Sequence, residues 1–539
     1  MKADQGRHGV VLVKRLPLWF FHLSARYQRP VRSLREVPEE EVERISSRGI
    51  TFLWLIGVWE RSNASRRLKE LMGKGDVLGS AYAITAYRVD PSAGTREDLL
   101  SLRRRLHRYG IGLMVDVVPN HTAIDSDWVY GHPDWFISTR EAPFPWYRFS
   151  GENLSSHPHI EIRVEDGYYT RKDAAVVFER RDRRTGEVRY LYHGNDNQSV
   201  PWNDTAQLDY TRQDLREEML RTIRRVGEAA DGIRFDAAML LMRDQYRRLW
   251  FPAPGERTMV PSRERFSLGD EEFSALYPRE FWDEVEEVCL EFPHLFTVAE
   301  VFWGLQDACA SRFFFDAVYD ASFAAHVAAE ENSRFQERLR DLARRPERAG
   351  RMLFYLSSPD DLPPLMRYDP LRKYQGAVVF LTTLPGSILF THGQWEGFRE
   401  KYEMDGKSPG WEEGAELEAW HDETITPLLK ERELFARPER WEVCRFSTEG
   451  GFVEDVFSFF SQRGGRRHLV CYNNSGSPRN GMVLKEGGWG PPSGGGRRLS
   501  WYDRISGRRG GGDLHVVERE GLPLALAPYQ AVVLELSYE

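Results

Sequence analysis

The chain has 539 residues, of which 41% are hydrophobic and 29% are charged, and its formal net charge is −8. This length exceeds what a single hydrophobic core usually supports, so we expect two or three domains. The acidic balance argues against the basic surface that nucleic acid requires, and the arginine-rich stretch at 103–108 has the pattern of a solvated helix face. We therefore expect an enzyme-sized globular protein with no nucleic-acid partner.

Neither a membrane span nor a secretion signal is indicated by the sequence. No run reaches the roughly 18 apolar residues that a spanning helix needs, so no membrane partner is expected. The N-terminal stretch places charges inside its apolar segment and lacks a small-residue cleavage site, which predicts a cytoplasmic protein. The four cysteines are far apart and form no CxxC pair, so buried free thiols are expected rather than zinc or redox chemistry. The oligomeric state is left open.

Short apolar runs alternate with amphipathic helical patterns through most of the chain. Residues 95–108 begin with a capping-box pattern at Thr95 and Asp98 and place leucines on one face, and residues 212–226 show the same helical spacing. Strand, helix and strand in repetition predict a parallel sheet, and eight runs fit a (β/α)8 TIM barrel in the α/β class. The predicted strand-like runs are 16–23, 50–59, 110–118, 232–236, 295–302, 317–323, 352–358 and 386–393.

Two segments interrupt this alternation and predict further domains. Residues 122–210 form a polar stretch that is too long for a loop, so we expect an inserted subdomain after the third strand, above the barrel. After 438 the helical pattern stops, and strand-like runs such as RHLVCYNN, RRLSWYD, LHVVERE and LALAPYQAVVLEL follow, separated by glycine-rich segments. We therefore expect a barrel from 1–121 and 211–438, a subdomain at 122–210 and a C-terminal antiparallel β-sandwich at 439–539.

Four motifs place polar residues where predicted strands end. They are DVVPNH at 116–121, GIRFDAAM at 232–239, TVAEVF at 297–302 and FYLSSPDD at 354–361. Active sites of such barrels lie at the C-terminal ends of the strands. One such fragment is weak evidence, but the ordered set resembles glycoside hydrolase family 13, the α-amylase family. That resemblance extends over about residues 15 to the end of the chain and implies cleavage or transfer of α-glucosidic bonds.

The resemblance assigns the catalytic roles. Asp236 would be the nucleophile, with Arg234 two residues earlier holding its carboxylate ionised and aimed, although the pair also fits a structural ion pair. Glu300, after an apolar run, would be the general acid/base with a raised pKa, although a Glu at a strand end also caps loops. Asp360 would bind the sugar hydroxyls and stabilise the transition state.

Further residues of the motifs would bind the substrate. The resemblance implies that His121 donates to the glucose at the cleavage site and that Asp116 is mainly structural. Tyr82 would stack under the same glucose, although an ordinary core tyrosine is the alternative interpretation of its sequence. Asn120 would bind a structural calcium ion, for which the sequence identifies no further ligands. No other cofactor is expected.

Two positions depart from the family pattern. Where the family has Asn-His-Asp after the seventh strand, this chain has Ser358-Pro359-Asp360, so an imidazole donor is missing and the loop is stiffer. After Asp236, Met239 and Leu240 replace the usual Lys-His type of pair, which makes the leaving-group side less polar.

We expect a retaining enzyme that acts on α-glucans or maltooligosaccharides by hydrolysis, with transglycosylation as a further activity. The proline before Asp360 and the stretch WVYGHPDWF at 128–136 also resemble maltosyltransferases that use a sugar phosphate donor. A third alternative is a catalytically inactive, glucan-binding family member, which the presence of Asp236, Glu300 and Asp360 disfavours.

Overall fold

The computed structural model describes residues 7–539 except 76, 197–199, 402–413 and 491–496. Its centre is a closed barrel of eight strands, each hydrogen-bonded in parallel to its neighbours, in the order β1-β16-β15-β14-β13-β12-β5-β2. The strands are β1 (Val10–Arg15), β2 (Phe52–Ile56), β5 (Gly112–Val117), β12 (Gly232–Phe235), β13 (Phe296–Ala299), β14 (Ala317–Asp320), β15 (Met352–Tyr355) and β16 (Ser387–Phe390). The predicted (β/α)8 barrel is confirmed.

Helices surround the barrel and bury one apolar face each. Helix α4 (Arg96–Arg108) begins with the predicted capping box at Thr95 and Asp98, and α7 (Gln213–Ala229) covers the second predicted helical stretch. The other principal helices are α1 (Leu18–Arg26), α2 (Glu39–Ser47), α8 (Arg243–Trp250), α10 (Phe281–Leu290), α11 (Gln306–Arg312), α12 (Asn332–Ala343), α15 (Leu371–Leu381) and α16 (Ala415–Trp420). None of the described helices is long and apolar enough to cross a membrane.

The first predicted strand is wrong. Residues 16–23 were expected to be a strand, but they lie in a turn and in helix α1, and the strand is the preceding segment, β1. The run Val10–Val13 is rich in β-branched residues and is buried, whereas Pro17 ends the strand and precedes the first turn of the helix. The apolar face of α1, with Trp19, Phe20 and Leu23, packs on the barrel and gave the misleading apolar run.

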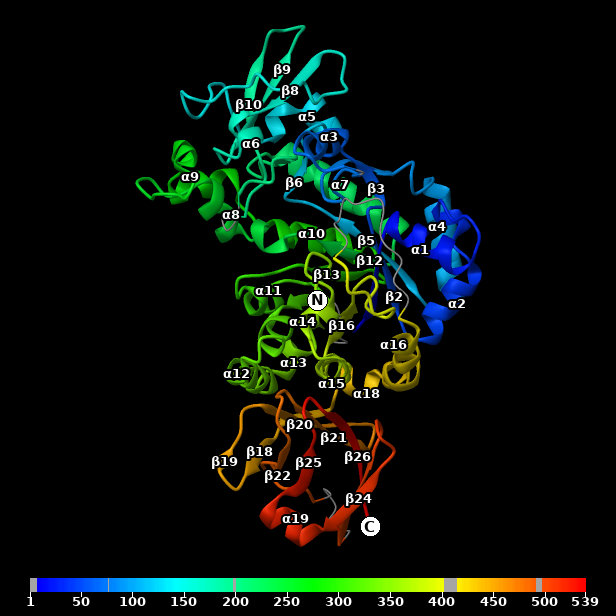
Figure 1. Ribbon diagram of the computed structural model, residues 1–539. Coiled ribbons are helices and arrows are strands. Elements are labelled where there is room, and N and C mark those ends of the chain that lie inside the picture. Colours follow the sequence, from blue (N-terminus) through cyan, green and yellow to red (C-terminus); the bar gives the residue numbers. More distant parts are fainter. Residues whose placement is uncertain (1–6, 76, 197–199, 402–413, 491–496) are drawn as a thin grey trace.

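Two smaller β structures lie at opposite ends of the barrel (Figure 1). Between β5 and β12 the chain forms a four-stranded antiparallel sheet, in the order β7 (Ser138–Thr139), β10 (Val188–Tyr192), β9 (Val177–Asp182), β8 (Ile160–Val164). A short ladder of β6 (His121–Ala123) with β11 (Thr205–Gln207) joins this insertion to the barrel. The motif residue His121 therefore lies where barrel and insertion meet.

The C-terminal part is built from two antiparallel sheets, as expected. One contains β17 (Arg440–Val443), β20 (Val456–Arg463), β21 (Arg466–Asn473), β26 (Ala531–Tyr538), β23 (Arg498–Asp503) and β24 (Arg509–Asp513); the other contains β19 (Gly451–Phe452), β18 (Arg445–Thr448), β22 (Arg479–Leu484) and β25 (Leu522–Leu526). Phe380 of α15 packs against Phe457, Phe459 and Tyr472, which fixes this part to the barrel.

The predicted strand LHVVERE is wrong: it is helix α19 (Leu514–Glu520), because the Asp513 side chain caps its first turn.

All four cysteines are free and buried, as expected.

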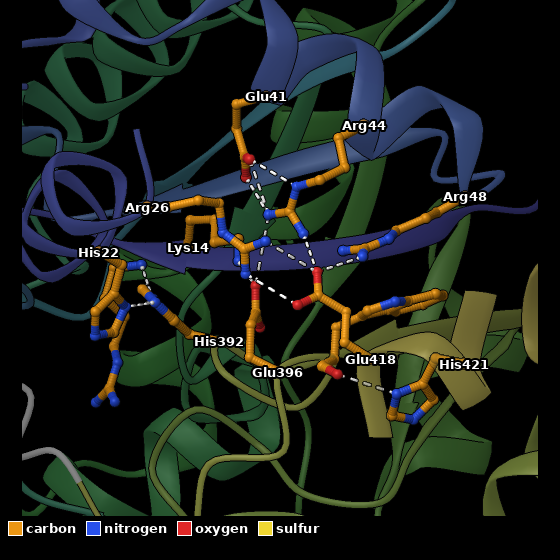
Figure 2. Close-up of polar contacts among 12 residues, drawn as sticks. Lys14, His22, Arg26, Glu41, Arg44, Arg48, His392, Glu396, Glu418 and His421 are labelled. Carbon is orange, nitrogen blue, oxygen red and sulfur yellow. Dashed lines mark hydrogen bonds and ion pairs between the residues drawn. The ribbon is translucent and has the colours of Figure 1, made fainter. Parts of the chain in front are cut away.

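A group of charged side chains is also buried outside the barrel wall, between β1, α2 and the segment after β16 (Figure 2). Lys14 Nζ lies 3.1 Å from Glu396 Oε1, and their side chains are only 3% and 9% exposed. Arg44 contacts Glu396 at 3.7 Å and bonds Glu418 at 2.5 Å, and Arg48 bonds Glu418 at 2.6 Å. These contacts hold the segment that follows the last barrel strand against the first.

We predict that Glu396→Gln lowers the unfolding free energy by about 3–5 kcal/mol, because it leaves the Lys14 ammonium buried without its anion. The double variant Lys14→Met/Glu396→Gln should be less destabilised than Glu396→Gln alone. Burial opposes ionisation of Glu396, but Lys14 and Arg44 hold its pKa well below the usual value. The contribution is therefore present above the unfolded-state pKa near 4.3 and is lost as the pH falls towards the folded-state pKa.

Urea and thermal denaturation midpoints at pH 7 and below pH 4 test this prediction. Glu40→Gln is a matched control, because Glu40 pairs with Arg29 at 3.3 Å but both side chains are more than half exposed. Its effect should stay below about 1 kcal/mol. An equal loss of unfolding free energy in Glu396→Gln and Glu40→Gln would show that the buried ion pair stabilises the fold no more than the exposed one.

Candidate active site

A pocket of about 310 Å³ opens at the C-terminal ends of the barrel strands, beneath the inserted sheet. It brings together five residues predicted from sequence: Tyr82, His121, Asp236, Glu300 and Asp360. Its other lining residues are Ser80, Asp196, Trp202, Asp204, Thr205, Ala237, Met239 and Phe302. A larger hollow of about 790 Å³ lies on the barrel flank beside α7 and contains none of the motif carboxylates. The smaller pocket is therefore the candidate active site.

Arg234 is the centre of the charge arrangement below this pocket. Its Nη1 lies 2.5 Å from Asp236 Oδ1 and 3.2 Å from Asp116 Oδ1, and its Nη2 lies 2.5 Å from Glu300 Oε1. The side chain is 1% exposed, and its guanidinium lies over the rings of Trp54 and Tyr82, 5.2 Å from each centroid. One buried cation thus contacts three carboxylates.

Strand register explains why these groups meet. In the ladder between β12 and β5, Arg234 pairs with Asp116, so the two side chains lie on the same face of neighbouring strands. In the ladder between β12 and β13, Phe235 pairs with Ala299, so Asp236 and Glu300 directly follow paired residues. The backbone N–H of Asp236 donates to Val117 at 2.9 Å, and that of Glu300 donates to Phe235 at 3.0 Å. The two carboxylates are therefore set side by side by the sheet itself.

A tight turn after Asp236 fixes Glu300. Ala237 has φ +44°, a left-handed conformation that costs a non-glycine residue roughly 1 kcal/mol or more. In this conformation its N–H donates to Glu300 Oε2 at 2.8 Å, while Ala238 N–H donates to the Glu300 carbonyl at 2.9 Å. With Arg234 on Oε1, both oxygens of Glu300 have donors, which holds the carboxyl group in a single orientation.

Burial and like charges raise the pKa of the acids that the barrel motifs place at the pocket. Burial raises the pKa of Asp236 and of Glu300, although Arg234 acts in the opposite sense on both. The neighbouring Asp236 charge raises the pKa of Glu300 further, so the pair favours one ionised and one protonated carboxyl. Burial also raises the pKa of Asp116 to about 7. This is the division of states that a nucleophile and an acid need.

Asp360 is on the loop after β15 and lines the same pocket as this pair. Its side chain is open to the pocket space, yet enclosure by protein, followed by the Glu300 charge, raises its pKa to about 6. The loop is held by Ser358 N–H, which donates to Asp361 Oδ2 at 3.0 Å, and by Asp361 N–H, which donates to the Ser358 carbonyl at 3.2 Å. With Pro359 between them, these bonds keep the turn stiff, as its sequence predicts.

His121 and Tyr82 complete the predicted sugar-binding set. His121 is buried, and burial lowers its pKa to about 4, so the ring is a neutral donor or acceptor at working pH. Its ring lies 5.1 Å from that of Trp202. The hydroxyl of Tyr82 is buried and has no hydrogen-bond partner among the described atoms. An unpartnered hydroxyl beside the pocket is available to a ligand.

The side-chain amide of Asn120, which the sequence suggests as a calcium ligand, is paired with Gln207. Its Oδ1 accepts from Gln207 Nε2 at 3.1 Å, and its Nδ2 donates to Gln207 Oε1 at 3.2 Å. In the described part of the chain, no group of three His, Cys, Asp or Glu side chains is placed to hold a metal ion. Asn120 instead joins the barrel to β11 through a reciprocal amide pair.

The sequence did not identify several lining residues. Trp202 and Asp204 come from the insertion, and Asp196 precedes the undescribed residues 197–199. Asp204 Oδ2 accepts from Ser65 Oγ at 2.6 Å and lies 3.9 Å from Lys69 Nζ. Phe302 lies two residues after Glu300, so the motif could have suggested it. No local pattern marked Trp202 or Asp204, because their approach depends on how the insertion folds back.

Comparisons with known proteins identify the family of the chain. The family model described as the catalytic domain of alpha amylase matches residues 40–341. A curated relative, Alpha-amylase 3 of Dictyoglomus thermophilum, is 22% identical over 216 residues, which are 39% of this chain and only 33% of that protein. This match therefore spans about a third of the relative's length.

Solved structures match over the whole length. A maltogenic alpha-amylase from Thermotoga neapolitana has a TM-score of 0.65 and 17% identity, with 100% of both chains covered. A trehalose-6-phosphate hydrolase from Bacillus licheniformis has a TM-score of 0.63 and 13% identity, with 99% of this chain and 100% of that chain covered. At such identities these structures establish the fold. Since the family model covers more than half of the sequence and the barrel matches along its full length, the chain belongs to the α-amylase family of glycoside hydrolases.

Proposed function

We propose that this protein is a retaining glycoside hydrolase that cleaves α-glucosidic bonds in neutral maltooligosaccharides or α-glucans, with transfer to a sugar hydroxyl as a second outcome. The observation that supports it most is that Asp236 and Glu300 bind the two arms of one guanidinium. Covalent geometry places those arms about 2.3 Å apart, which limits the nearest carboxylate oxygens to roughly 7 Å. This limit includes the separation of about 5–5.5 Å found in retaining enzymes and excludes most of the range of about 6.5–9.5 Å found in inverting enzymes.

The first half of the reaction needs a proton donor and a nucleophile. Glu300, protonated through its raised pKa, gives its proton to the leaving glycosidic oxygen as the bond to the anomeric carbon breaks. The Asp236 carboxylate attacks that carbon and forms a glycosyl ester. Arg234 stays bound to both carboxyl groups. It therefore stabilises the negative charge on Asp236 before the step and on Glu300 after it.

The second half reverses these roles. Glu300, now a carboxylate, takes a proton from water or from a sugar hydroxyl, whose oxygen attacks the anomeric carbon and releases Asp236. Asp360, in the same pocket, stabilises the positive charge that develops on the sugar ring in both halves. His121 and the unpartnered hydroxyl of Tyr82 bind the same ring. Two attacks on opposite faces retain the anomeric configuration.

A sugar phosphate donor fits this pocket poorly. Five carboxylates line it, on Asp196, Asp204, Asp236, Glu300 and Asp360, and no lysine or arginine appears among its described lining residues. Phosphate recognition needs the cationic, forked donors that arginine supplies. The acidic lining therefore supports neutral substrates over the donor of a maltosyltransferase. An inactive glucan-binding role is likewise disfavoured, since all three catalytic carboxyls meet in one pocket.

Asp236→Asn and Glu300→Gln should each lower kcat on maltoheptaose by at least about a thousandfold while the circular dichroism spectrum stays unchanged. Each change is nearly isosteric, and it removes the charge or the proton that one step requires. Following the wild-type products by proton NMR should show α-anomers first. Initial release of β-anomers, or turnover by either variant at the wild-type rate, would contradict the mechanism.

The charge of the pocket predicts its substrate preference. Wild-type protein should hydrolyse maltoheptaose and should not transfer maltose from maltose 1-phosphate to glycogen. Asp204→Asn removes one carboxylate from the lining and should weaken exclusion of a phosphorylated substrate without creating a phosphate site. Chromatography of products with both substrates checks this. Efficient transfer from maltose 1-phosphate, without hydrolysis of maltoheptaose, would instead favour the transferase.

Arg234→Lys tests the shared guanidinium. A lysine keeps the charge, but its single ammonium cannot hold two carboxylates by separate arms. We expect kcat/KM to fall by roughly a hundredfold or more, since each lost charged hydrogen bond is worth about 1.5–3 kcal/mol. Thermal unfolding should show a folded protein, because the three carboxylates keep a neighbouring cation. Activity close to wild type would show that the fork has no positioning role.

A further inference from the structure

Asp116 lies in the floor beneath the catalytic pocket. It is 4% exposed and is not among the described residues that line the pocket, so it reaches the reacting groups through another side chain. Its Oδ1 lies 3.2 Å from Arg234 Nη1, the same nitrogen that lies 2.5 Å from Asp236 Oδ1. The guanidinium therefore divides one nitrogen between the floor carboxylate and the nucleophile. Whatever holds Asp116 also affects how Arg234 is placed.

The second oxygen of Asp116 is held by Trp54. The indole Nε1 of Trp54 donates to Asp116 Oδ2 at 3.1 Å, and within the described residues this oxygen accepts no other hydrogen bond. The same indole, which is 1% exposed, presents its face to Arg234, with the guanidinium carbon 5.2 Å from the ring centroid. That distance is typical of a cation–π contact. One side chain thus contacts the carboxylate with its edge and the guanidinium with its face.

Three neighbouring strands bring these groups together. Trp54 belongs to β2, Asp116 to β5 and Arg234 to β12, and β5 lies between the other two in the barrel. In the ladder between β2 and β5, Trp54 pairs with Met114, which lies two residues before Asp116 on the same face of its strand. Trp54 and Met114 both belong to the core inside the barrel. The indole therefore lies one layer below Asp116 and closes the floor of the site.

We propose that Trp54 is a positioning residue for the reaction, which fixes the carboxylate of Asp116 and, through it, the guanidinium of Arg234. This inference rests on the proposed function. Trp54 is not among the described residues that line the pocket, so its effect on the reaction passes through these two side chains. An indole donates a hydrogen bond but accepts none, so its N–H favours the ionised form of the carboxyl group that it contacts.

The charge on Asp116 acts on the acid of the reaction. Burial raises the pKa of Asp116 to about 7, whereas Arg234 and the Trp54 N–H lower it. Asp236 and Glu300 raise it as well, and coupling between charges is mutual, so an ionised Asp116 favours the protonated state of Glu300. Without the indole N–H, Asp116 binds a proton near neutral pH and leaves Arg234 to the catalytic pair. Glu300 then loses its proton more easily.

The other ionisable groups around the floor do not change with Trp54. Asp360, on the loop after β15, adds a negative charge near Glu300. Several tyrosines also face Asp116 or Glu300, and burial raises the pKa of each well above neutral pH, so they keep their protons. They are Tyr82, Tyr87, Tyr319 and Tyr355.

The pH dependence of kcat/KM tests the proposal. Glu300 must be protonated to act, so activity falls as the pH rises through its pKa. Trp54→Phe keeps an aromatic face but removes the N–H, so this basic limb should move to lower pH by about 0.5–1 unit. We expect kcat to fall about tenfold with little change in KM, because Trp54 does not contact the sugar. Asp116→Asn should move the limb in the same direction, and adding Trp54→Phe to it should cause no further shift.

Trp59→Phe is the matched control. Trp59 Nε1 donates to the backbone carbonyl of Asp116 at 2.7 Å, and Trp59 is 6% exposed. This change therefore removes a buried indole donor from the same residue without touching its carboxylate. It should lower the thermal unfolding midpoint and leave the basic limb in place. A purely structural role for Trp54 would leave the basic limb in place in Trp54→Phe as well, which would contradict the proposal.

Two further measurements separate the result from folding and from turnover. Benzothienylalanine in place of Trp54 keeps the size of the indole but has sulfur instead of the N–H, so it should reproduce the shift without leaving a cavity. Carbon-13 NMR of carboxyl-labelled glutamate, with the Glu300 signal assigned by its absence in Glu300→Gln, should show a lower Glu300 pKa in both replacements.

The proposal is overturned if the Glu300 pKa matches that of wild type in either replacement of Trp54. A further shift of the basic limb when Trp54→Phe is added to Asp116→Asn would equally overturn it, because Trp54 would then act by another route. Absence of glucan hydrolysis in the wild-type protein would overturn the proposed function alone, since the NMR titration would still report the contact.

Discussion

The arrangement of this site depends on one buried guanidinium. Arg234 contacts Asp116, Asp236 and Glu300 while aromatic rings exclude water from its faces, so the protein places a single positive charge where three negative charges meet. Desolvating such a group costs more than one ion pair returns, and only the combined contacts make it tolerable. Burial raises the pKa values of these acids, and Arg234 acts in the opposite sense on each of them; a raised pKa is what general acid catalysis requires. Stability therefore favours full pairing of these buried charges, whereas the chemistry favours a carboxyl group that stays protonated.

The buried charged group outside the barrel wall is arranged in the opposite way, with about as many cations as anions. Lys14 alternates with the inward residues of β1 and meets Glu396, Arg44 and the groups around Glu418, where cations and anions nearly balance. Because each cation here has a neighbouring anion, these ion pairs hold the segment after the last barrel strand against the first strand. One strand, β1, thus presents a structural cation on its outer face and Arg15 towards the mouth. The charge-balanced group around Lys14 and Glu396 therefore lies next to the barrel wall, and the acid-rich pocket lies at the barrel mouth.

The sequence was sufficient for the barrel and for the motif residues, because both are encoded locally. A buried strand that ends in an acid places that acid at the mouth, and Tyr82, His121, Asp236, Glu300 and Asp360 do share one pocket. Errors arose where an apolar run had two interpretations: residues 16–23 bury a helix face, and LHVVERE follows a capping aspartate. Trp202 and Asp204 were missed because their place depends on distant segments folding together. The amide pair of Asn120 with Gln207, far apart in the chain, was equally beyond local patterns.

The loss of the imidazole before Asp360 is intelligible once the charges are counted. A histidine there would be a weak and pH-dependent donor, and burial lowers the pKa of His121 in the same pocket to about 4. Proline gives up that donor and stiffens the turn, which Ser358 and Asp361 already close by hydrogen bonds. The orientation of Asp360 then comes from the backbone, whereas burial and the Glu300 charge raise its pKa to about 6 and Arg234 acts in the opposite sense. Orientation and charge, which one histidine would combine, are divided here between a rigid loop and the shared guanidinium of Arg234.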